Sequence, residues 1–234
     1  MRSSAFRAWR AGIALCALAV AVPAGAATVG STFDVDVDGW TVTTFNDNGN
    51  PNFLSVFATG FSPTFVGAGG NPGGYASIAD PDNGWTYFIA PGKFLGDQAD
   101  KLGGTLGFSL QHAINGGTPV GNPPHAVLLG AGTVLVHDAG GPPAATPAWS
   151  TYVVPLEAAA WRLGNVGGAT PDAATFAAVL GNLSGLYLAG EFVTPVVEVN
   201  GLDSVALTAV PLPGMAGLFA LAVGVLGTRG RRRT

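Results

Sequence analysis

Short runs of β-branched, aromatic and aliphatic residues recur along the middle of this chain, and each run is bounded by glycine, proline or asparagine. The clearest runs read WTVTTF, YASIAD, WTYFIA, GTLGFSLQH, AVLLG, TVLVHD, STYVVPL and SVALTAV, with spacers such as NDNGNPN and GAGGNPGG. Many short strands with such turns are typical of an antiparallel sandwich or barrel. No segment repeats, and the spacers are too short to separate domains, so we expect one all-β domain.

One segment, ATPDAATFAAVLGNL, has the pattern of a helix instead. We expect Thr170 to cap it, Pro171 to occupy the first helical position and Asp172 to lie in the first turn. Gly181 marks its expected end. The apolar side chains expected to face the sheet are Phe176, Val179, Leu180 and Leu183.

Residues 1–27 have the composition of a secretory signal peptide. Three arginines precede the apolar run AGIALCALAVAV, and small residues follow it, which predicts cleavage near Ala26 or Ala27. An uncleaved anchor helix is the alternative, but the run is short for a span of ~20 residues. A lipoprotein signal is disfavoured because Leu15 precedes Cys16 where a small residue is needed. Cleavage removes the only cysteine, so the mature protein must be stabilised by its core, or by a core and a metal ion.

Charge is distributed unevenly along the chain. Only Lys93, Lys101 and Arg162 of the ten basic residues lie between residues 28 and 209, whereas all fourteen acidic residues do. This body therefore carries a formal net charge of −11, although the whole chain sums to −4. We expect it to bind neither nucleic acid nor anionic membranes through charge. Its many carboxylates suit calcium, which prefers oxygen ligands.

The last segment, residues 210–234, combines a proline pair, an apolar stretch and a basic end. Residues 212–228 carry no charge and would form ~25 Å of helix, against a ~30 Å hydrocarbon core. The arginines after it would stay on the cytoplasmic side. The residues that define the two ends of this pattern are Pro211, Pro213, Arg229, Arg231, Arg232 and Arg233.

This order of parts resembles the PEP-CTERM sorting signal of Gram-negative bacteria that make extracellular polysaccharide. The resemblance implies recognition and cleavage by a membrane exosortase, and delivery to the cell surface or extracellular matrix. The membrane would then be contacted only through the tail before processing. Leu212 departs from the usual acidic residue between the prolines. A plain single-span anchor and a glycolipid-anchor signal are the alternatives, although the latter does not normally end in arginines.

The body, residues 28–209, resembles a laminin B (laminin IV) domain. The resemblance rests on TFDVDVDGW, APGKFLGDQ followed by LGFSL, and the closing GLDSVAL. It implies a galactose-binding-type jelly roll, related in shape to carbohydrate-binding modules. A non-catalytic role that binds extracellular polysaccharide is the expected function, and a purely structural or adhesive matrix protein is the alternative.

The residues give little support for catalysis, so we expect no enzyme; a glycoside hydrolase with an unrecognised site remains the further alternative. The body has no cysteine and no G-x-S-x-G motif. A glycosidase needs two carboxyl groups about 5–10 Å apart, but Asp80 and Asp82 lie in ADPDNGW, which has the composition of a hairpin turn. The three histidines are scattered, without H-E-x-x-H spacing: His112, His125 and His137.

Two acids are candidates for a structural calcium site. Asp34 follows Phe33 in the expected first strand, and Asp203 opens the expected last strand. The resemblance implies that these strands meet and that the two acids share one calcium ion. Strand alternation would place Asp36 and Asp38 on the same face as Asp34. The alternative is a solvated acidic edge that repels other strands.

Aromatic residues are the candidates for sugar contact, because a sugar face stacks on an aromatic ring. In WTYF, Trp85 and Tyr87 share one face of a strand and are the predicted ligand-binding pair. Packing in the core is the alternative role for most rings. The other tryptophans and tyrosines of the body are Trp40, Tyr75, Trp149, Tyr152, Trp161 and Tyr187.

Overall fold

Antiparallel strands arranged in two facing sheets make up most of the domain. The computed structural model describes residues 27–46, 56–82, 84–113, 118–119, 123–194 and 198–210. Residues 1–26 and 211–234, which contain nearly all of the predicted signal peptide and sorting tail and every sorting residue named above, lie outside this described part. Among the helices within it, none is long and apolar enough to cross a membrane.

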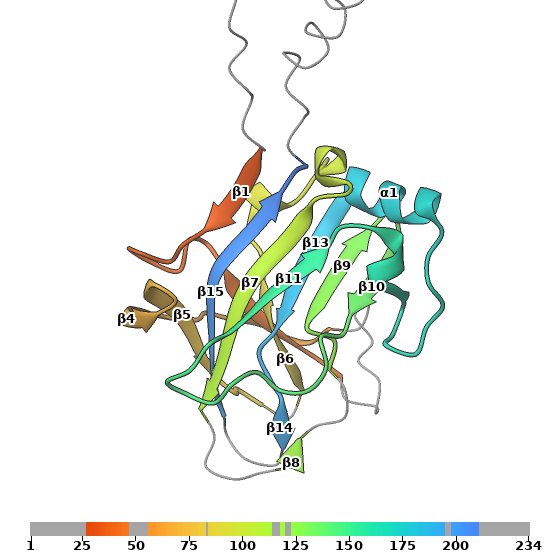
Figure 1. Cartoon of the computed structure of the whole chain (residues 1–234). Helices are drawn as coiled ribbons and strands as arrows, with labels where there is room; N and C mark the ends of the chain where they lie inside the picture. Colours follow the sequence, from red (N-terminus) through yellow and green to blue (C-terminus); the bar gives the residue numbers. More distant parts are fainter. Residues whose placement is uncertain are drawn as a thin grey trace, which may run out of the picture. The chain divides into compact units, whose positions relative to one another are not determined.

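The first sheet, here called sheet A, faces the viewer in Figure 1. It contains β11 (Ser150–Pro155), β7 (Thr105–Ala113), β15 (Val199–Thr208), β5 (Gly73–Ala79) and β4 (Thr64–Gly70) in this order, and β1 (Thr28–Ser31) also pairs with β15. The pairing of Val29 with Leu207 joins the first strand to the last.

The second sheet, sheet B, lies behind sheet A. It contains β12 (Arg162–Leu163), β10 (Thr133–His137), β9 (Ala126–Gly130), β13 (Leu183–Ala189), β6 (Trp85–Ile89), β2 (Thr41–Phe45) and β3 (Val56–Phe61) in this order. A small pair, β14 (Val193–Thr194) and β8 (Thr118–Pro119), stands apart from both. The expected all-β antiparallel sandwich with one short helix is confirmed.

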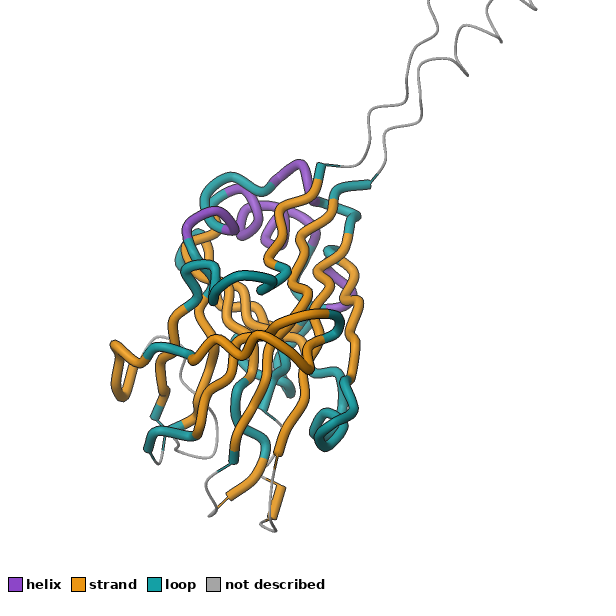
Figure 2. The backbone as a smooth tube through the Cα atoms, turned by 90° about the vertical axis from the view of Figure 1, so that its left-hand side faces the viewer, coloured by secondary structure: helices purple, strands orange, loops and turns teal. Residues whose placement is uncertain are grey.

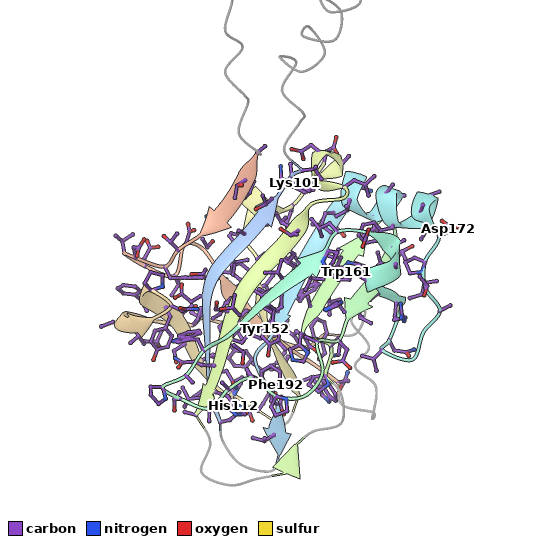
Figure 3. The ribbon with its side chains drawn as sticks, viewed as in Figure 1. Lys101, His112, Tyr152, Trp161, Asp172 and Phe192 are labelled. Atoms are coloured by element: carbon purple, nitrogen blue, oxygen red, sulfur yellow. The ribbon has the colours of Figure 1, made fainter. Side chains whose placement is uncertain are left out.

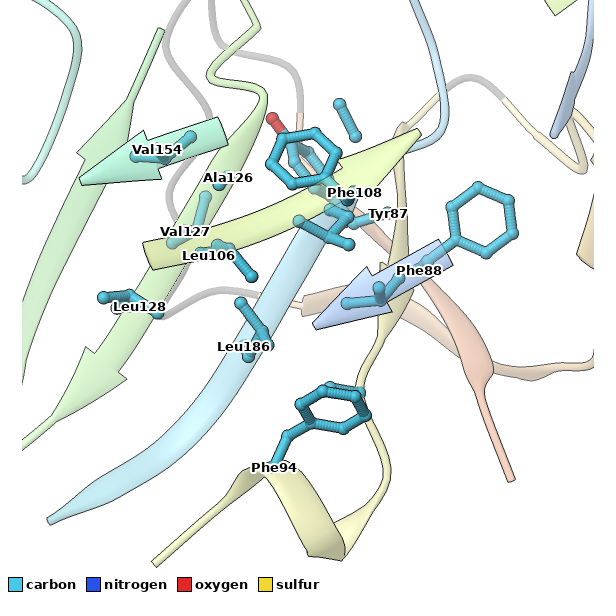
Figure 4. Packing of buried hydrophobic residues seen from close by; sticks show 14 of the residues in the cluster. Tyr87, Phe88, Phe94, Leu106, Phe108, Ala126, Val127, Leu128, Val154 and Leu186 are labelled. Carbon is cyan, nitrogen blue, oxygen red and sulfur yellow. The ribbon is translucent and has the colours of Figure 1, made fainter. Parts of the chain in front are cut away.

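The core lies between the two sheets and is aliphatic and aromatic. Leu106 and Phe108 of β7 face Leu186 of β13 and Leu128 of β9, with Phe88 of β6 beside them (Figure 4). Each is at most 1% exposed. Burying a side chain of this kind stabilises the fold by roughly 1.5–3 kcal/mol, which is how a chain with no cysteine in the body holds together.

The one α-helix, α1 (Ala173–Gly181), covers one end of the sandwich together with the short turn η2 (Ala99–Lys101) (Figure 2). Its cap is Asp172, whose carboxylate accepts a hydrogen bond from the Thr175 amide at 2.6 Å. The expected cap at Thr170 is therefore wrong, because Pro171 precedes the cap instead of opening the helix. The buried side chains of the helix are Phe176, Val179 and Leu180, as expected. Leu183 is also buried, but it lies in β13 and not on the helix.

The described part of the chain has two further short 3-10 turns. They are η1 (Gly92–Phe94) and η3 (Ala158–Ala160). Phe94 of η1 packs edge-on against Trp40, with ring centroids 5.5 Å apart. Trp40 in turn packs on Phe33 at 6.1 Å and donates its indole N–H to the Ser31 hydroxyl at 2.9 Å. These contacts anchor the loop that follows β1.

Candidate functional site: the β4–β5 turn and the outer face of sheet A

The two acids proposed as calcium ligands approach the same tight turn. β4 and β5 are joined by Asn71 and Pro72, with Gly70 paired to Gly73 across the turn. A methyl group built on Gly70 would lie 2.7 Å from Oδ2 of Asp203, and one built on Gly73 would lie 2.7 Å from Oδ1 of Asp34. Only glycine leaves room for both carboxylates, so the turn and the acids fit together.

Asp203 is completely buried and is held by backbone amides. It lies in the middle of β15, and does not open the strand as the sequence suggested. A bulge begins there, with Ser204 at φ 52°. Its carboxylate accepts hydrogen bonds from the amides of Ser204 at 2.6 Å and of Asn71. Burial and the nearby charge of Asp34 raise the pKa of Asp203 above its usual value, although these hydrogen bonds partly lower it.

Asp34 belongs to the loop after β1, and the expectation that it lies in the first strand is wrong. Its neighbour Phe33 is buried in the core with φ 53°, which leaves the Asp34 side chain exposed at the surface. Oδ2 of Asp34 accepts a hydrogen bond from the Thr32 hydroxyl at 2.7 Å.

Asp36 and Asp38 do not line up with Asp34, because strand alternation does not apply to a loop. Oδ1 of Asp36 accepts a hydrogen bond from the backbone amide of Asp38 at 2.7 Å, which closes a local turn. Asp38 itself forms an ion pair with Lys93. Desolvation raises the pKa of Asp38, but the hydrogen bonds to Lys93 and Ser31 and the charge of Lys93 together bring the pKa below its usual value.

The donor atoms at the turn suit a hard cation. Besides the carboxylates of Asp34 and Asp203, the hydroxyls of Thr32 and Ser204 and the Asn71 carbonyl lie here, and Ser204 donates to that carbonyl at 2.7 Å. All are oxygens, which calcium prefers. Within the described residues no three His, Cys, Asp or Glu side chains gather around a metal position, so an ion here would need backbone and hydroxyl oxygens as well.

Beside the turn, an aromatic pair lies on the face of sheet A that points away from the core. Ala76 and Leu202 point into the core, so their neighbours Tyr75 and Gly201 point outward. A methyl group built on Gly201 would lie 3.0 Å from Cη2 of Trp149, which places that ring over the strand. Tyr75 meets Trp149 edge-on at 5.4 Å, and both rings are half-buried.

Amide and hydroxyl groups surround the aromatic pair. The Trp149 indole N–H donates to the Gly69 carbonyl at 2.9 Å, which ties the ring to β4. The side-chain amide of Asn71 donates hydrogen bonds to the hydroxyls of Ser109 and Thr151, each at 3.1 Å. We call this surface the outer face of sheet A. Its accessible residues are Tyr75, Trp149 and Thr151, whereas Ser77, Ser109, Gln111, Gly201 and Asp203 point the same way but are buried.

The predicted sugar-stacking pair lies elsewhere. Trp85 is 6% exposed and Tyr87 is 1% exposed, because β6 is a central strand of sheet B and is buried on both faces. The Tyr87 hydroxyl donates to the Pro124 carbonyl at 3.1 Å, and its ring packs edge-on against Phe45 at 5.7 Å. A ring that stacks on a sugar needs a free face, so these two residues are not part of the candidate site.

Asp80 and Asp82 lie in the loop that connects the two sheets, and not in a hairpin turn as the sequence suggested. They join β5 of sheet A to β6 of sheet B. Oδ1 of Asp82 accepts from the Gly84 amide at 2.7 Å, and Oδ1 of Asp80 accepts from the Thr86 hydroxyl at 3.2 Å. Burial raises the pKa of Asp80. These contacts give both carboxylates structural roles.

His125 and His137 lie near each other, since His137 pairs with Ala126, and Nδ1 of His125 lies 3.4 Å from the Asp138 carboxylate. Nε2 of His125 lies 2.9 Å from the Gly141 carbonyl, and Nδ1 of His137 lies 2.7 Å from the Ala160 carbonyl. His112 lies near Phe192 at the far end of the sandwich from α1 (Figure 3), with ring centroids 6.2 Å apart. None is paired with a nucleophile among the described contacts.

The comparison with protein families decides the assignment of this sandwich. The laminin B (domain IV) profile matches residues 87–224, more than half of the chain. The chain belongs to the laminin B family. The L4b domain of human laminin alpha-2 aligns with a TM-score of 0.50 and 12% identity over 58% of this chain and 80% of that domain, which shows a shared fold.

A more distant similarity is to a family 11 carbohydrate-binding module from the cellulosomal cellulase Lic26A-Cel5E of Clostridium thermocellum. It covers 80% of this chain and 89% of that module at 12% identity, with a TM-score of 0.37. That score is too low to carry an argument about the site.

The laminin B match includes only part of the candidate site. Trp149 and Asp203 fall within residues 87–224, whereas Asp34, Asn71 and Tyr75 precede it. The turn and its aromatic neighbour are therefore contributed by the part of this laminin B protein that lies before the matched segment. Sequence reasoning missed the pairing of Tyr75 with Trp149 because the loop before Trp149 carries no strand pattern.

A buried polar cluster lies at the same end of the sandwich as His112. Glu198 is fully buried, and its Oε1 accepts a hydrogen bond from the Phe192 amide. Three buried atoms have no hydrogen-bond partner among the described groups: Nδ1 of His112, Oε2 of Glu198 and Oδ1 of Asn200. Burial raises the pKa of Glu198 to about 7, with a further increase from the charge of Asp80.

Proposed function

We propose that this laminin B domain is a non-catalytic module of a secreted surface or extracellular-matrix protein, and that it binds extracellular polysaccharide. The observation that carries the proposal is the half-exposed pair Tyr75 and Trp149 on the outer face of sheet A, with ring centroids 5.4 Å apart. Rings with amide and hydroxyl neighbours match the apolar faces and polar rims of sugars.

A binding assay tests this proposal directly. The purified protein is mixed with polysaccharide isolated from the producing organism, and the bound fraction is measured by co-sedimentation. Trp149→Ala should weaken binding by roughly tenfold or more, as for a central aromatic contact. Leu102→Ala is the control, because Leu102 is 48% exposed but lies outside sheet A. Wild-type protein that binds no polysaccharide would leave the structural or adhesive role as the better explanation.

We also propose that the β4–β5 turn holds one structural calcium ion, through Asp34 and Asp203. The support is the placement of both carboxylates against Gly70 and Gly73, with the Thr32 and Ser204 hydroxyls and the Asn71 carbonyl oxygen nearby. The ion would tie β1 and β15 to the turn. Because Gly69 accepts the hydrogen bond of Trp149, the same ion would steady the aromatic pair.

For export and sorting we propose the route that the ends of the sequence imply. Residues 1–27 direct secretion, and residues 210–234 act as a PEP-CTERM-type signal that an exosortase removes at the membrane. The support is the order of the two prolines, the apolar stretch and the arginines. The mature domain would then reside at the cell surface or in the extracellular matrix of a Gram-negative bacterium.

A further inference from the structure

Every basic side chain of the domain is already engaged within the protein. Lys93 pairs with Asp38 and also donates to the Gly30 carbonyl at 2.7 Å. Lys101 is buried, with its side chain 4% exposed, and lies 2.5 Å from the carboxylate of Asp100.

Arg162 is engaged in the same way by its own neighbourhood. Nη1 of Arg162 donates to the carbonyls of Ala159 and Trp161 at 3.2 and 2.8 Å and to the Thr170 hydroxyl at 3.1 Å. Lys93 lies in η1, Lys101 in η2 and Arg162 in β12 of sheet B. None of the three belongs to a strand of sheet A, and residues 28–210 contain no other lysine or arginine.

The charges next to the aromatic pair are negative instead. The Trp149 indole N–H donates a hydrogen bond to the Gly69 carbonyl, and the Asp203 carboxylate lies against the next residue, Gly70. Asp34 approaches Gly73 on the other side of the same turn. An acidic or sulfated sugar on this face would find no lysine or arginine to pair with, and a calcium ion held by Asp34 and Asp203 would offset only those two carboxylates.

We infer that the outer face of sheet A binds an uncharged polysaccharide and discriminates against anionic ones. This inference rests on the proposed polysaccharide-binding function and adds the chemical class of the ligand. Recognition would come from the faces of Tyr75 and Trp149 and from neutral hydrogen-bonding groups, of which the exposed Thr151 hydroxyl and the half-buried Asn71 side chain are the nearest. Rejection would come from the lack of a basic side chain on this face and from the net negative charge of the domain.

The test compares one polysaccharide in two charge states. Extracellular polysaccharide from the producing organism is used as isolated and after chemical reduction of its uronic acid carboxyls to alcohols. Commercial hydroxyethylcellulose and carboxymethylcellulose form a second pair with a common backbone. Binding to each is measured at low and high salt, with calcium and with chelator, for wild type and Trp149→Ala.

The inference predicts that neutral forms bind at least as tightly as charged forms, with a change of less than about twofold between low and high salt. Binding to charged forms should be weaker at low salt than at high salt, because salt screens the repulsion. Trp149→Ala should lose binding to the neutral form while melting as a folded protein.

Three outcomes overturn the inference in different ways. Binding of the native polysaccharide that is lost after carboxyl reduction and persists in chelator would show an anionic ligand, and would leave the binding function standing. Binding of charged forms that is lost in chelator would show a calcium bridge to an anionic ligand and overturn it equally. No binding of any form would overturn the proposed function and this inference together.

Discussion

Glu198 gives the sharpest stability prediction, because its carboxyl is buried without a cation nearby. The fully buried side chain has one oxygen bonded to the Phe192 amide and one, Oε2, without a partner among the described groups. Oδ1 of Asn200, two residues further along the chain in β15, also lacks a donor among the described groups. A proton on Glu198 removes the buried charge and supplies a donor to this cluster, in which Asp80 and His112 are the other titratable neighbours.

The pH dependence follows from the raised pKa. Burial raises the pKa of Glu198 from 4.5 to about 7, which corresponds to roughly 3 kcal/mol of folding free energy. Since the folded pKa is above the unfolded one, this stability is fully present below pH 4.5 and is lost as the pH rises to about 7. Above that pH the loss is complete and the curve flattens.

The perturbation that tests this is Glu198→Gln, which keeps the shape and a donor but cannot ionise. Relative to wild type, the variant should gain roughly 3 kcal/mol between pH 4 and pH 8, or roughly 6–12 °C in Tm at 2–4 °C per kcal/mol. Thermal scans at several pH values measure the difference, so other carboxyl groups cancel. Glu157→Gln is the control, because that side chain is exposed and makes no cap hydrogen bond. Parallel curves for wild type and Glu198→Gln would refute the reasoning.

Three further predictions concern the metal, the tail and the helix. Chelation should lower Tm by roughly 5–11 °C if calcium is at about 100 times its Kd. Asp203→Ala should lower Tm in calcium and abolish most of the response to chelator, whereas Asp82→Ala should keep that response. A wild-type protein whose Tm does not depend on calcium would contradict the site. Mass spectrometry of the secreted protein should find a C-terminus close to residues 211–214, and intact extracellular peptides containing Arg231 would contradict processing. Asp172→Ala should lower Tm and Asp172→Asn should not, because asparagine can still cap the helix; equal melting of all three proteins would argue against the cap.

The architecture was predictable from the sequence because its strands carry their own signal. Runs such as STYVVPL and GTLGFSLQH correspond to β11 and β7, and their alternation places Leu106 and Phe108 in the core. β4 was not predicted, because its sequence TFVGAGG is rich in glycine and its residues are largely exposed. Glycine favours turns over strands when only local preference is considered.

The candidate site was only partly predictable, for reasons that lie in tertiary structure. The pairing of β1 with β15 was expected, and it brings Asp34 and Asp203 toward one turn. The bulge after Asp203 and the loop containing Asp34 were not, because a bulge leaves no periodic signal. Alternation within WTYF could not reveal that Trp85 and Tyr87 are both buried, since neighbouring strands and covering segments decide burial on each face of a central strand.

Hydrogen exchange on the protein with and without polysaccharide from the producing organism tests the central claim most directly. If the outer face of sheet A is the binding face, amide exchange should slow in β5 around Tyr75, in β15 around Gly201 and in the segment leading to Trp149. The effect should disappear in Trp149→Ala. Protection confined to the strands of sheet B, or unchanged in Trp149→Ala, would contradict the account.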